Sequence, residues 1–411
     1  MTSTKTRPVA GGRTTHERRI TTALFAAGLA TFATMYSAQA LLPSLSAAFG
    51  ATPAHAALAV SLTTGVVALA IIPVSALSSR FGRTRVMTVS AVSSAVIGVL
   101  LPFSPTLDVL LTGRALQGLT LAGVPAVAMA YLAEEIGPDG LGAAMGVYIA
   151  GTTFGGLAGR VIPAFTLSVA SWRWAEATIS IAAAVCTVWF VRGLPPSRSF
   201  VARPAGIRTV LGDLAAQLRH RGLLTLFALI FVLIGGFVSL YNFLGYRLTR
   251  PPFELPEAVA GLVFVLYLAG SAAAAITGRV ADRVGRLRVL ATAVAIMAVG
   301  LAMTIPDNLV TLVIGMSLCT AGFFGAHTVA GAWVGAMANG NRGAASSLYL
   351  FAFYLGSSII GGAGGIAYVH YGWPGLVLGV AVLLVIAAIL VGTLTIHAKS
   401  RSGAEQMTVG I

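Results

Sequence analysis

Four ionisable side chains lie inside long apolar stretches of this 411-residue chain, and these groups have the most chemistry to offer. They are Arg114, Arg160, Glu176 and His327. A charged side chain inside hydrocarbon is costly unless it is paired or hydrated, so each is a candidate functional residue. We expect Glu176 to form an ion pair with Arg114 or Arg160. The alternative is a glutamate at the level of the lipid headgroups.

His327 lies in the middle of its apolar stretch, whereas the twelve acidic residues lie near or beyond the ends of theirs. It is therefore the only mid-stretch side chain that ordinarily titrates near neutral pH. Proton carriers in membrane pumps are usually buried Asp, Glu or His. Two interpretations follow. Either His327 carries a coupling proton, or it is a neutral histidine hydrogen-bonded to a hydroxyl of the eleventh stretch.

The elements that must position these residues are membrane-spanning helices. Hydrophobic residues make up 57% of the chain and charged residues 9%, and the mean hydropathy is +0.90. A soluble domain has about a quarter of its residues charged. Twelve apolar stretches of roughly 18 residues or more are each long enough to cross the hydrocarbon core. They cover about 20–42, 57–77, 86–103, 107–132, 141–167, 174–192, 222–245, 258–278, 288–306, 309–337, 344–368 and 372–396.

The net charge of +14 is distributed in a way that indicates membrane orientation. Most of the 26 lysine and arginine residues lie in the N-terminal tail, in alternate loops and in a central linker, on one predicted side of the membrane. The loops on the other side hold only Arg173, Arg247 and Arg250. Cytoplasmic loops carry an excess of lysine and arginine, so this pattern places both termini in the cytoplasm. We expect a lipid bilayer, and no nucleic acid, among the partners.

Two short basic loops repeat one pattern roughly 200 residues apart, which indicates a duplicated unit. The loops cover residues 75–85 and 278–288. Trp172 with Trp373 and Gly113 with Gly315 recur at nearly the same offset. The sequence therefore predicts an all-α membrane protein with twelve transmembrane helices in two pseudo-symmetric six-helix bundles.

The apolar stretches divide the chain into five parts. The predicted parts are a basic cytoplasmic tail at 1–19, an N-terminal six-helix bundle at 20–192, a cytoplasmic linker at 193–221, a C-terminal six-helix bundle at 222–396 and a cytoplasmic tail at 397–411. The linker is rich in proline and arginine, and we expect a short amphipathic helix around Leu211–Leu218.

The repeated loops resemble the loop motif of the major facilitator superfamily, G-x-L-x-D-R-x-G-R-[KR]-x. Glycine permits a tight turn at positive φ. Arginine and aspartate side chains can bind the ends of neighbouring helices, so such loops would latch the two bundles together at their cytoplasmic ends. The alternative is a simple topology anchor. Ser79 stands in the first loop where the motif has the aspartate. The first loop keeps Leu77, Arg80, Gly82, Arg83 and Arg85, and the second matches at Gly278, Asp282, Arg283, Gly285 and Arg286.

A second motif of that family, R-x-x-Q-G, matches Arg114, Gln117 and Gly118. The resemblance implies that Arg114 and Gln117 help to couple proton movement to conformational change, and a structural arginine bonded to carbonyl groups is the alternative. A third motif, G-x-x-x-G-P-x-x-G-G, is typical of the drug–proton antiporters. Here Gly156 replaces the proline and Arg160 replaces the last glycine. The chain looks most like the bacterial drug-efflux and arabinose-efflux-permease-like branch, although this departure weakens the antiporter assignment.

In that fold the substrate site lies between the bundles, so the polar and aromatic residues in the middle of the central helices form the expected binding set. Such a pocket is apolar and aromatic with few hydrogen-bonding groups, which suits drug-sized amphipathic solutes better than sugars. Helix packing is the alternative explanation for any single member. The set consists of Met35, Tyr36, Gln39, Tyr148, Thr152, Tyr241, Asn242, Tyr267, His327, Tyr349 and Tyr354.

The expected function is secondary active transport by alternating access in a bacterial plasma (inner) membrane, with proton-coupled efflux of small amphipathic or drug-like compounds. A proton gradient would supply the energy, with no cofactor or metal, and we expect a monomer. The alternative within transport is a uniporter or importer of a small metabolite, for which Arg114 and Arg160 suggest an anion. An integral-membrane enzyme is disfavoured, because the sequence has no HExxH or GxSxG motif. A channel does not explain the repeated loops.

Overall fold

The computed structural model is built of helices, and it describes residues 15–136, 138–198, 207–338 and 341–408. No strand occurs within those ranges, so the all-α prediction is confirmed there. The helices are α1 (Thr15–Phe49), α2 (Pro53–Phe81), α3 (Arg83–Leu100), α4 (Leu107–Leu121), α5 (Gly123–Glu135), α6 (Pro138–Leu167), α7 (Trp172–Gly193), α8 (Ile207–Leu218), α9 (Arg221–Thr249), α10 (Glu257–Gly261), α11 (Tyr267–Val284), α12 (Arg286–Met303), α13 (Leu309–Met337) and α14 (Arg342–Thr408), with the 3₁₀ segments η1 (Leu101–Phe103) and η2 (Leu262–Leu266).

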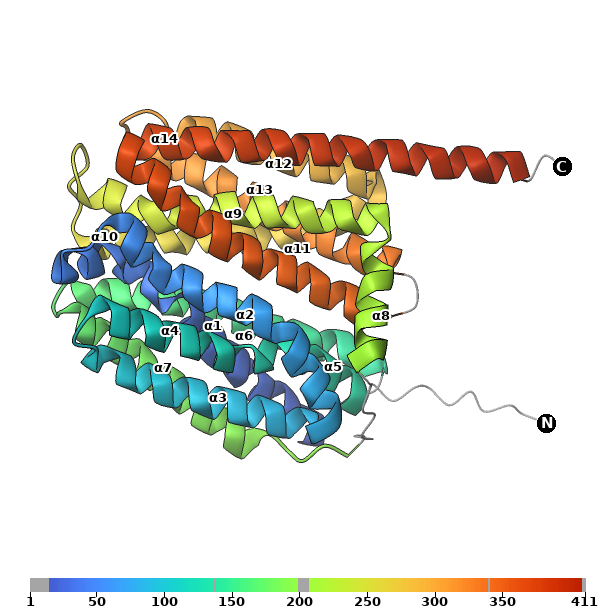
Figure 1. Cartoon of the computed structure of the whole chain (residues 1–411), viewed down its shortest axis with the longest axis horizontal. Coiled ribbons are helices and arrows are strands. Elements are labelled where there is room, and N and C mark those ends of the chain that lie inside the picture. The colour runs from blue at the N-terminus through green and yellow to red at the C-terminus, as the bar shows by residue number, and fades with distance from the viewer. Residues whose placement is uncertain (1–14, 137, 199–206, 339–340, 409–411) are drawn as a thin grey trace, which may run out of the picture.

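Eleven segments of the described chain are long and apolar enough to cross a membrane. The last of them covers Arg342–Thr395 and contains both the eleventh and the twelfth predicted spans. The two arms of α14 meet at Gly372, whose φ of 63° and ψ of −157° turn the chain back. Glycine is at ease in this conformation. Figure 1 shows the two arms of α14 meeting at a sharp bend and diverging from it. Counting the two arms separately accounts for the expected twelve spans.

The fourth predicted span is broken between α4 and α5. Pro125 has no N–H, so the carbonyl group of Leu121 loses its helical partner there. Ser90 of α3 binds two neighbouring backbone groups at the break: its hydroxyl donates to the carbonyl oxygen of Thr120 and accepts from the backbone N–H of Gly123 at 3.0 Å. The break is therefore a proline kink that a neighbouring serine stabilises.

The eighth predicted span is also irregular. It begins with α10, continues as the 3₁₀ segment η2 and becomes α-helical only from Tyr267. A 3₁₀ stretch inside a membrane span has poorer hydrogen-bond geometry than an α-helix and often marks a hinge. This segment lies against α6 of the other half of the chain.

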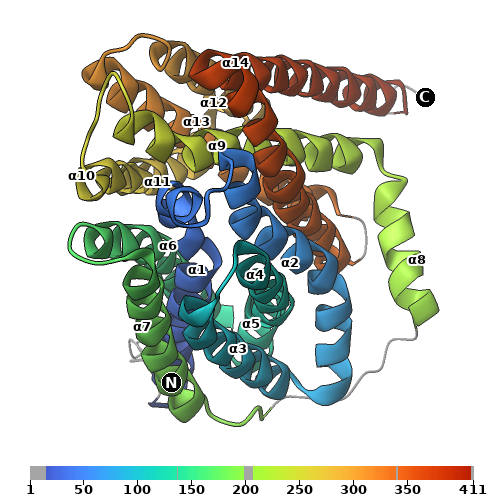
Figure 2. The same ribbon diagram turned by 60° about the vertical axis from the view of Figure 1, so that its left-hand side comes forward.

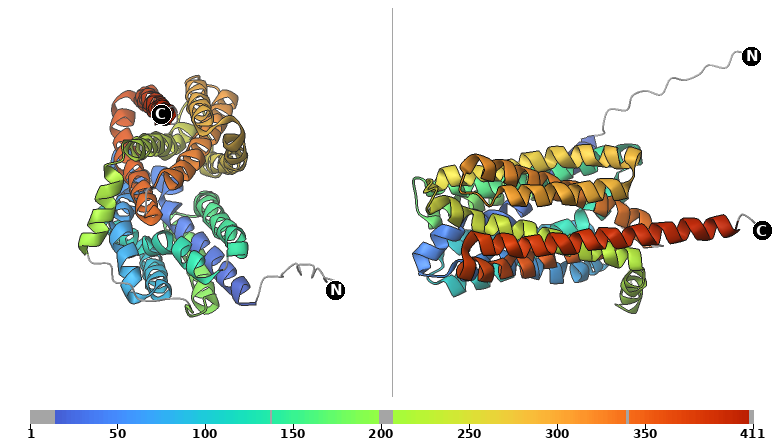
Figure 3. Two further views of the ribbon diagram at one scale, coloured as in Figure 1. Left: turned by 90° about the vertical axis from the view of Figure 1, so that its right-hand side faces the viewer. Right: turned by 90° about the horizontal axis from the view of Figure 1, so that it is seen from above.

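The helices form two bundles, one from α1–α7 and one from α9–α14, and α8 connects them along one end of the molecule (Figure 1). Figure 2 shows the blue-to-green bundle below the yellow-to-red bundle, with α8 at their side. The views along and across the bundles in Figure 3 show the same division. Helix α8 corresponds to the amphipathic helix that was expected in the linker around Leu211–Leu218.

Two helices extend into the predicted cytoplasmic tails, and the boundaries of these tails stay predictions. Helix α1 begins at Thr15, five residues before the predicted span, and α14 continues through the predicted tail 397–411 as far as Thr408. Residues 397–408 contain no proline and several good helix formers, so nothing in the sequence ends the helix at the membrane surface. Residues 1–14 and 409–411 lie outside the described residues.

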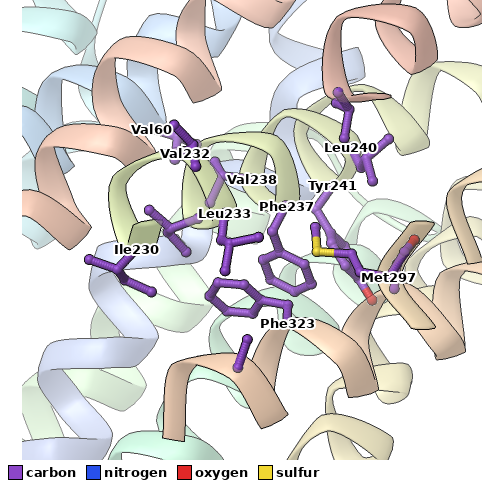
Figure 4. Packing of buried hydrophobic residues seen from close by; sticks show 14 of the residues in the cluster. Val60, Ile230, Val232, Leu233, Phe237, Val238, Leu240, Tyr241, Met297 and Phe323 are labelled. Atoms are coloured by element: carbon purple, nitrogen blue, oxygen red, sulfur yellow. The ribbon is translucent and has the colours of Figure 1, made fainter. Parts of the chain in front are cut away.

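Aromatic packing at the centre of the C-terminal bundle fixes α9 against α13. The rings of Phe237 and Phe323 are stacked with their centroids 4.2 Å apart, as Figure 4 shows. Tyr241 lies one turn from Phe237, and its hydroxyl is 2.7 Å from Thr320 Oγ1 on α13. These contacts hold α9 against α13 within the second bundle.

The two bundles meet mainly at the end opposite α8, which we call the distal end. The hydroxyl of Tyr246 on α9 donates to the carbonyl oxygen of Leu42 at 2.7 Å and lies 2.6 Å from Ser46 Oγ on α1. Ser44 donates to the carboxylate of Glu257 on α10 at 2.7 Å. A cavity of about 20 Å³ lies between α1, α9 and α10 at this end, which is the size of a single water molecule. The distal end is therefore closed.

Candidate functional site

Arg114 lies fully buried where α4 crosses α1 and α2. Its guanidinium group donates to the backbone carbonyl oxygens of Thr34, Met35 and Ala59 at 3.1–3.2 Å. It also donates to Ser37 Oγ at 3.2 Å and to Gln117 Oε1 at 2.8 Å. The group thus has five acceptors on three helices, which gives it a strong structural role as well as a charge.

The R-x-x-Q-G pattern has a direct physical explanation here. Gln117 is three residues after Arg114, so the two side chains share one face of α4. The side-chain amide nitrogen of Gln117 donates to the carbonyl oxygen of Ser94 on α3 at 3.3 Å. A Cβ on Gly118 would collide with the backbone carbonyl of Thr63 on α2. The motif therefore holds α4 against α2 and α3 around the buried charge.

Glu176 supplies the opposite charge to Arg114. Its Oε1 atom lies 3.8 Å from Arg114 Nη1, and Ser37 Oγ donates to the same oxygen at 3.4 Å. Glu176 is 3% exposed, so its side chain is buried inside the bundle and does not lie on the protein surface. Of the two pairings expected for Glu176, the structure shows the one with Arg114.

Arg160 is buried between the two bundles in the last third of α6. Its Nε donates to Gln39 Oε1 on α1 at 2.6 Å, and its Nη1 donates to the carbonyl oxygen of Gly156 at 2.6 Å. The guanidinium carbon lies 4.2 Å from the ring centroid of Tyr36 and 4.4 Å from that of Tyr267. Tyr36 belongs to the first bundle and Tyr267 to the second, so Arg160 occupies the interface.

The two buried arginines differ in their electrostatics. Arg114 has Glu176, whereas Arg160 has no ion pair among the described residues, and its Nη2 atom has no hydrogen-bond partner there. Cation–π contacts with two tyrosines stabilise a guanidinium group without cancelling its charge. The interface therefore holds an uncompensated positive charge within an aromatic wall.

Gln39 links this charge to the second bundle. Its amide nitrogen donates to Asn242 Oδ1 on α9 at 2.7 Å, and the Asn242 amide donates to the carbonyl oxygen of Gly361 on α14 at 3.2 Å. Gln39 and Asn242 are each at most 2% exposed. A continuous chain of polar contacts thus runs from α6 through α1 and α9 to α14.

Part of the predicted binding set gathers around Arg160. Tyr36, Gln39 and Tyr267 contact it, and Asn242 is one contact away. Tyr241 packs edge-on against Tyr267 with ring centroids 4.8 Å apart. Tyr354 of α14 shares one buried cluster with Met35 and Tyr36. These residues come from both bundles, as a site between two bundles requires.

Other members of the set have packing roles. The hydroxyl of Thr152 donates to the carbonyl oxygen of Ile149 in its own helix at 2.7 Å, and its methyl group lies against Gly28 of α1. Tyr148 belongs to a separate buried cluster of the first bundle. These two residues do not reach Arg160 in this conformation.

His327 is hydrogen-bonded to a hydroxyl of α14, as one of its two interpretations predicted. Its Nδ1 lies 2.8 Å from the hydroxyl of Tyr349 on α14, and that hydroxyl also contacts the carbonyl oxygen of His327 at 3.1 Å. The imidazole stacks between Phe323 and Tyr349. The geometry accounts for the histidine as part of the α13–α14 contact.

The two repeated loops lie at the end that carries α8, and they differ in the ion pairs that their charged residues form. Gly82 and Gly285 turn the chain at φ of 99° and 94°, as the motif predicts. Arg83 of the first loop pairs with Glu134 at the end of α5 at 2.9 Å. Asp282 of the second loop is exposed, and it forms no ion pair among the described residues.

Several residues of the site escaped the sequence reasoning. Glu134 completes the first loop from 51 positions away, and Phe264 lies 5.8 Å from the Arg160 guanidinium. Ser37 contacts both Arg114 and Glu176, and its place between Tyr36 and Gln39 was the available signal. No group of three His, Cys, Asp or Glu that could hold a metal occurs in the described part of the chain.

Comparison with known proteins gives a consistent result. The family model described as Major Facilitator Superfamily matches residues 24–250 and 248–407. The inner membrane transport protein YnfM of Escherichia coli K12 is 42% identical over 377 residues, which are 91% of this chain and 90% of that protein. The uncharacterized MFS-type transporter YybF of Bacillus subtilis is 38% identical over 382 residues, which are 93% and 95% of the two chains.

Solved structures share the architecture at low sequence identity. The crystal structure of the nucleoside transporter NupG superposes with a TM-score of 0.76 at 13% identity, over 91% of this chain and 99% of that one. At this identity the likeness concerns the arrangement of the helices alone.

Proposed function

Since the chain belongs to the major facilitator superfamily and is a secondary transporter, not an enzyme, we propose that it carries small amphipathic organic anions. The observation that carries the proposal is Arg160, a buried guanidinium group at the bundle interface that has no carboxylate partner in the described part of the chain. Burying a charge without a counter-charge is costly. A substrate carboxylate would supply that counter-charge during each transport cycle.

The surroundings of Arg160 favour an aromatic or apolar body attached to the anionic group. Tyr36, Tyr267 and Phe264 surround the guanidinium. Sites for small amphipathic ligands combine apolar walls with a few polar groups that fix orientation. The sequence suggested amphipathic solutes and, as an alternative, anionic metabolites. The charge of Arg160 and its aromatic surroundings favour a solute that is both amphipathic and anionic.

We propose that transport is coupled to protons through the Arg114–Glu176 pair. Glu176 is the buried carboxylate of the described residues that faces a buried arginine. Protonation would remove its charge and leave Arg114 with its five hydrogen-bond acceptors but no counter-charge, which would change the contact between α4 and α7. His327 is a weaker candidate, because Tyr349 already holds its ring nitrogen.

Efflux is the proposed direction. The interior of a bacterial cell is electrically negative, so an anion moves outward with the membrane potential. We place the end with α8 in the cytoplasm, because the basic loops lie there. The closed distal end then faces outward. We also propose that the protein is a monomer in the inner membrane.

Transport in proteoliposomes tests the substrate class. Benzoate, benzamide and benzylamine have similar size and differ in charge. We expect saturable uptake of benzoate that exceeds uptake of benzamide, and no saturable uptake of benzylamine. Preference for benzylamine, or equal rates for all three, would contradict an anion site. Imposed pH gradients and potassium diffusion potentials on the same vesicles test the coupling ion and the direction.

A further inference from the structure

Gln39 is shared between the proposed anion site and the contact that closes the distal end. Its Oε1 accepts from Arg160 Nε at 2.6 Å, and its Nε2 donates to Asn242 Oδ1 at 2.7 Å. Arg160 and Gln39 belong to the first bundle and Asn242 to the second. One amide group thus holds the arginine with one atom and the opposite bundle with the other.

We infer that Gln39 is a switch: an anion bound at Arg160 displaces the Gln39 amide and thereby releases the Gln39–Asn242 bridge at the closed end. The inference rests on the function proposed above. It identifies Gln39 as a positioning residue that converts substrate binding into opening, a role that neither arginine can perform alone.

Binding of an anion to Arg160 and the hydrogen bond between Gln39 and Arg160 exclude each other, because both use the same edge of the guanidinium group. Nε and Nη2 point their N–H groups along one edge, and a carboxylate binds this edge in a bidentate way. In Arg160, Gln39 occupies Nε while Nη2 has no partner among the described residues. An anion drawn to the free Nη2 therefore competes with Gln39 Oε1 for the adjacent Nε.

The competition favours the anion. A charged carboxylate forms shorter and stronger hydrogen bonds with a guanidinium than a neutral amide does, and it forms two of them where Gln39 forms one. The bond between Gln39 and Asn242 opposes the exchange, because it holds the amide in place. An anionic ligand is therefore required to displace the Gln39 amide, and a neutral ligand of the same shape does not displace it.

The segment next to Arg160 is irregular. Phe264 lies in the 3₁₀ segment η2, and Tyr267 is the first residue of α11 after it. Helices α10 and η2 pack against α6, and Glu257 of α10 accepts the hydrogen bond from Ser44. A 3₁₀ stretch at this place offers a hinge about which the distal half of the span can swing when the bridge is lost.

Distance measurements between the distal ends of the bundles test the inference. Val169, in the turn between α6 and α7, is 86% exposed, and Tyr371, next to the bend of α14 at Gly372, is 75% exposed. Spin labels at V169C and Y371C, in a chain with Cys186→Ala and Cys319→Ala, report the separation in nanodiscs. Benzoate, with benzamide as its neutral control, is the probe. We expect benzoate to populate longer distances and benzamide to leave the distribution unchanged.

Three variants separate the switch from general loosening of the distal end. Gln39→Leu and Asn242→Leu each remove the bridge, so both should show the longer distances without benzoate. Both should also bind radiolabelled benzoate roughly five-fold more tightly or better, because the hydrogen bonds that oppose the exchange are gone. Ser44→Ala is the matched control, since it removes a hydrogen bond between the bundles that does not involve Arg160. It should leave benzoate affinity and the benzoate-induced change intact.

The outcomes distinguish this inference from the proposed function. If benzoate binds wild type and needs Arg160, but the distances do not change and Gln39→Leu leaves affinity as it was, the anion binds the other guanidinium edge and the switch is wrong. The proposed anion site then still stands. If wild type does not bind benzoate, both proposals fail. If Gln39→Leu does not fold, the distances and the benzoate affinity of Asn242→Leu test the switch alone. This variant leaves the Arg160–Gln39 contact in place.

Discussion

Arg114 and Glu176 form a buried ion pair between α4 and α7, with Nη1 and Oε1 3.8 Å apart. The pair lies behind α1, whose Ser37 contacts both partners. On the other side of α1, Arg160 is buried without such a partner. One arginine is thus neutralised within its bundle, and the other is the residue that we propose binds the substrate between the bundles.

Glu176→Gln should separate substrate movement from proton movement. The amide keeps the shape of the side chain and a hydrogen bond to Ser37, and Arg114 retains its other five acceptors. We expect benzoate counterflow to persist while stimulation by a pH gradient is lost. Counterflow and gradient-driven uptake, measured on the same vesicles, give the result. Full stimulation by the gradient in this variant would remove Glu176 from the coupling role.

Arg114→Met should be far more damaging than Glu176→Gln. It removes five hydrogen bonds and leaves the Glu176 carboxylate buried without its counter-charge, a loss of about 3–5 kcal/mol for a buried pair. We expect a large fall in the melting temperature and in the yield of folded protein. Restoration of stability in Arg114→Met/Glu176→Leu, which removes both charges, would assign the effect to the orphaned carboxylate.

His327→Gln should retain proton-stimulated transport. The imidazole is held by Tyr349 and stacks with Phe323, so its loss affects the packing of α13 on α14. We expect a stability loss of about 1 kcal/mol, as for one hydrogen bond, with Tyr349→Phe giving a similar loss. Loss of the gradient effect with intact counterflow would instead make His327 the proton carrier.

The repeated loops should differ in their sensitivity to substitution. Asp282 is exposed without an ion pair in this conformation, so it is available to bind the opposite bundle in the other one. Asp282→Asn should reduce initial transport rates much more than Ser79→Ala. Glu134→Gln should have a small effect on stability, because the partly exposed pair with Arg83 contributes under about 1 kcal/mol. Equal rates for Asp282→Asn and Ser79→Ala would leave the loops as orientation signals only.

Glycines on one face of α6 should be intolerant of a methyl group. A Cβ on Gly155 or Gly159 would meet the backbone of Leu29 or Ala33 on α1, whereas Gly146 of the same helix has open space. Gly159→Ala should destabilise the protein by about 1–3 kcal/mol, as overpacking does, and Gly146→Ala should not. Melting temperatures of the two variants make the comparison. Equal values would show that α1 and α6 can separate slightly without loss.

The fold was predictable because apolar length and charge placement act on each span independently. The helix ends were less predictable, because nothing in residues 397–408 stops α14. The non-helical conformation of Gly372 separates the two arms of α14 that form the last two spans. The Arg114–Glu176 pair was half predictable, since Glu176 is the rare carboxylate inside a span. The surroundings of Arg160 were not, because Gln39 is 121 positions away and Tyr267 comes from the other bundle. Contacts of that kind depend on how the two bundles meet.

The ratio of benzoate to benzamide uptake in Arg160→Gln tests the central claim most directly. Arg192→Gln, an exposed arginine at the end of α7, is the matched control, and Arg160→Lys keeps the charge. We predict that the wild-type preference for benzoate is retained in Arg192→Gln, is partly retained in Arg160→Lys and is abolished in folded Arg160→Gln. An unchanged preference for benzoate in Arg160→Gln would show that the buried charge does not bind the substrate, and would contradict the account.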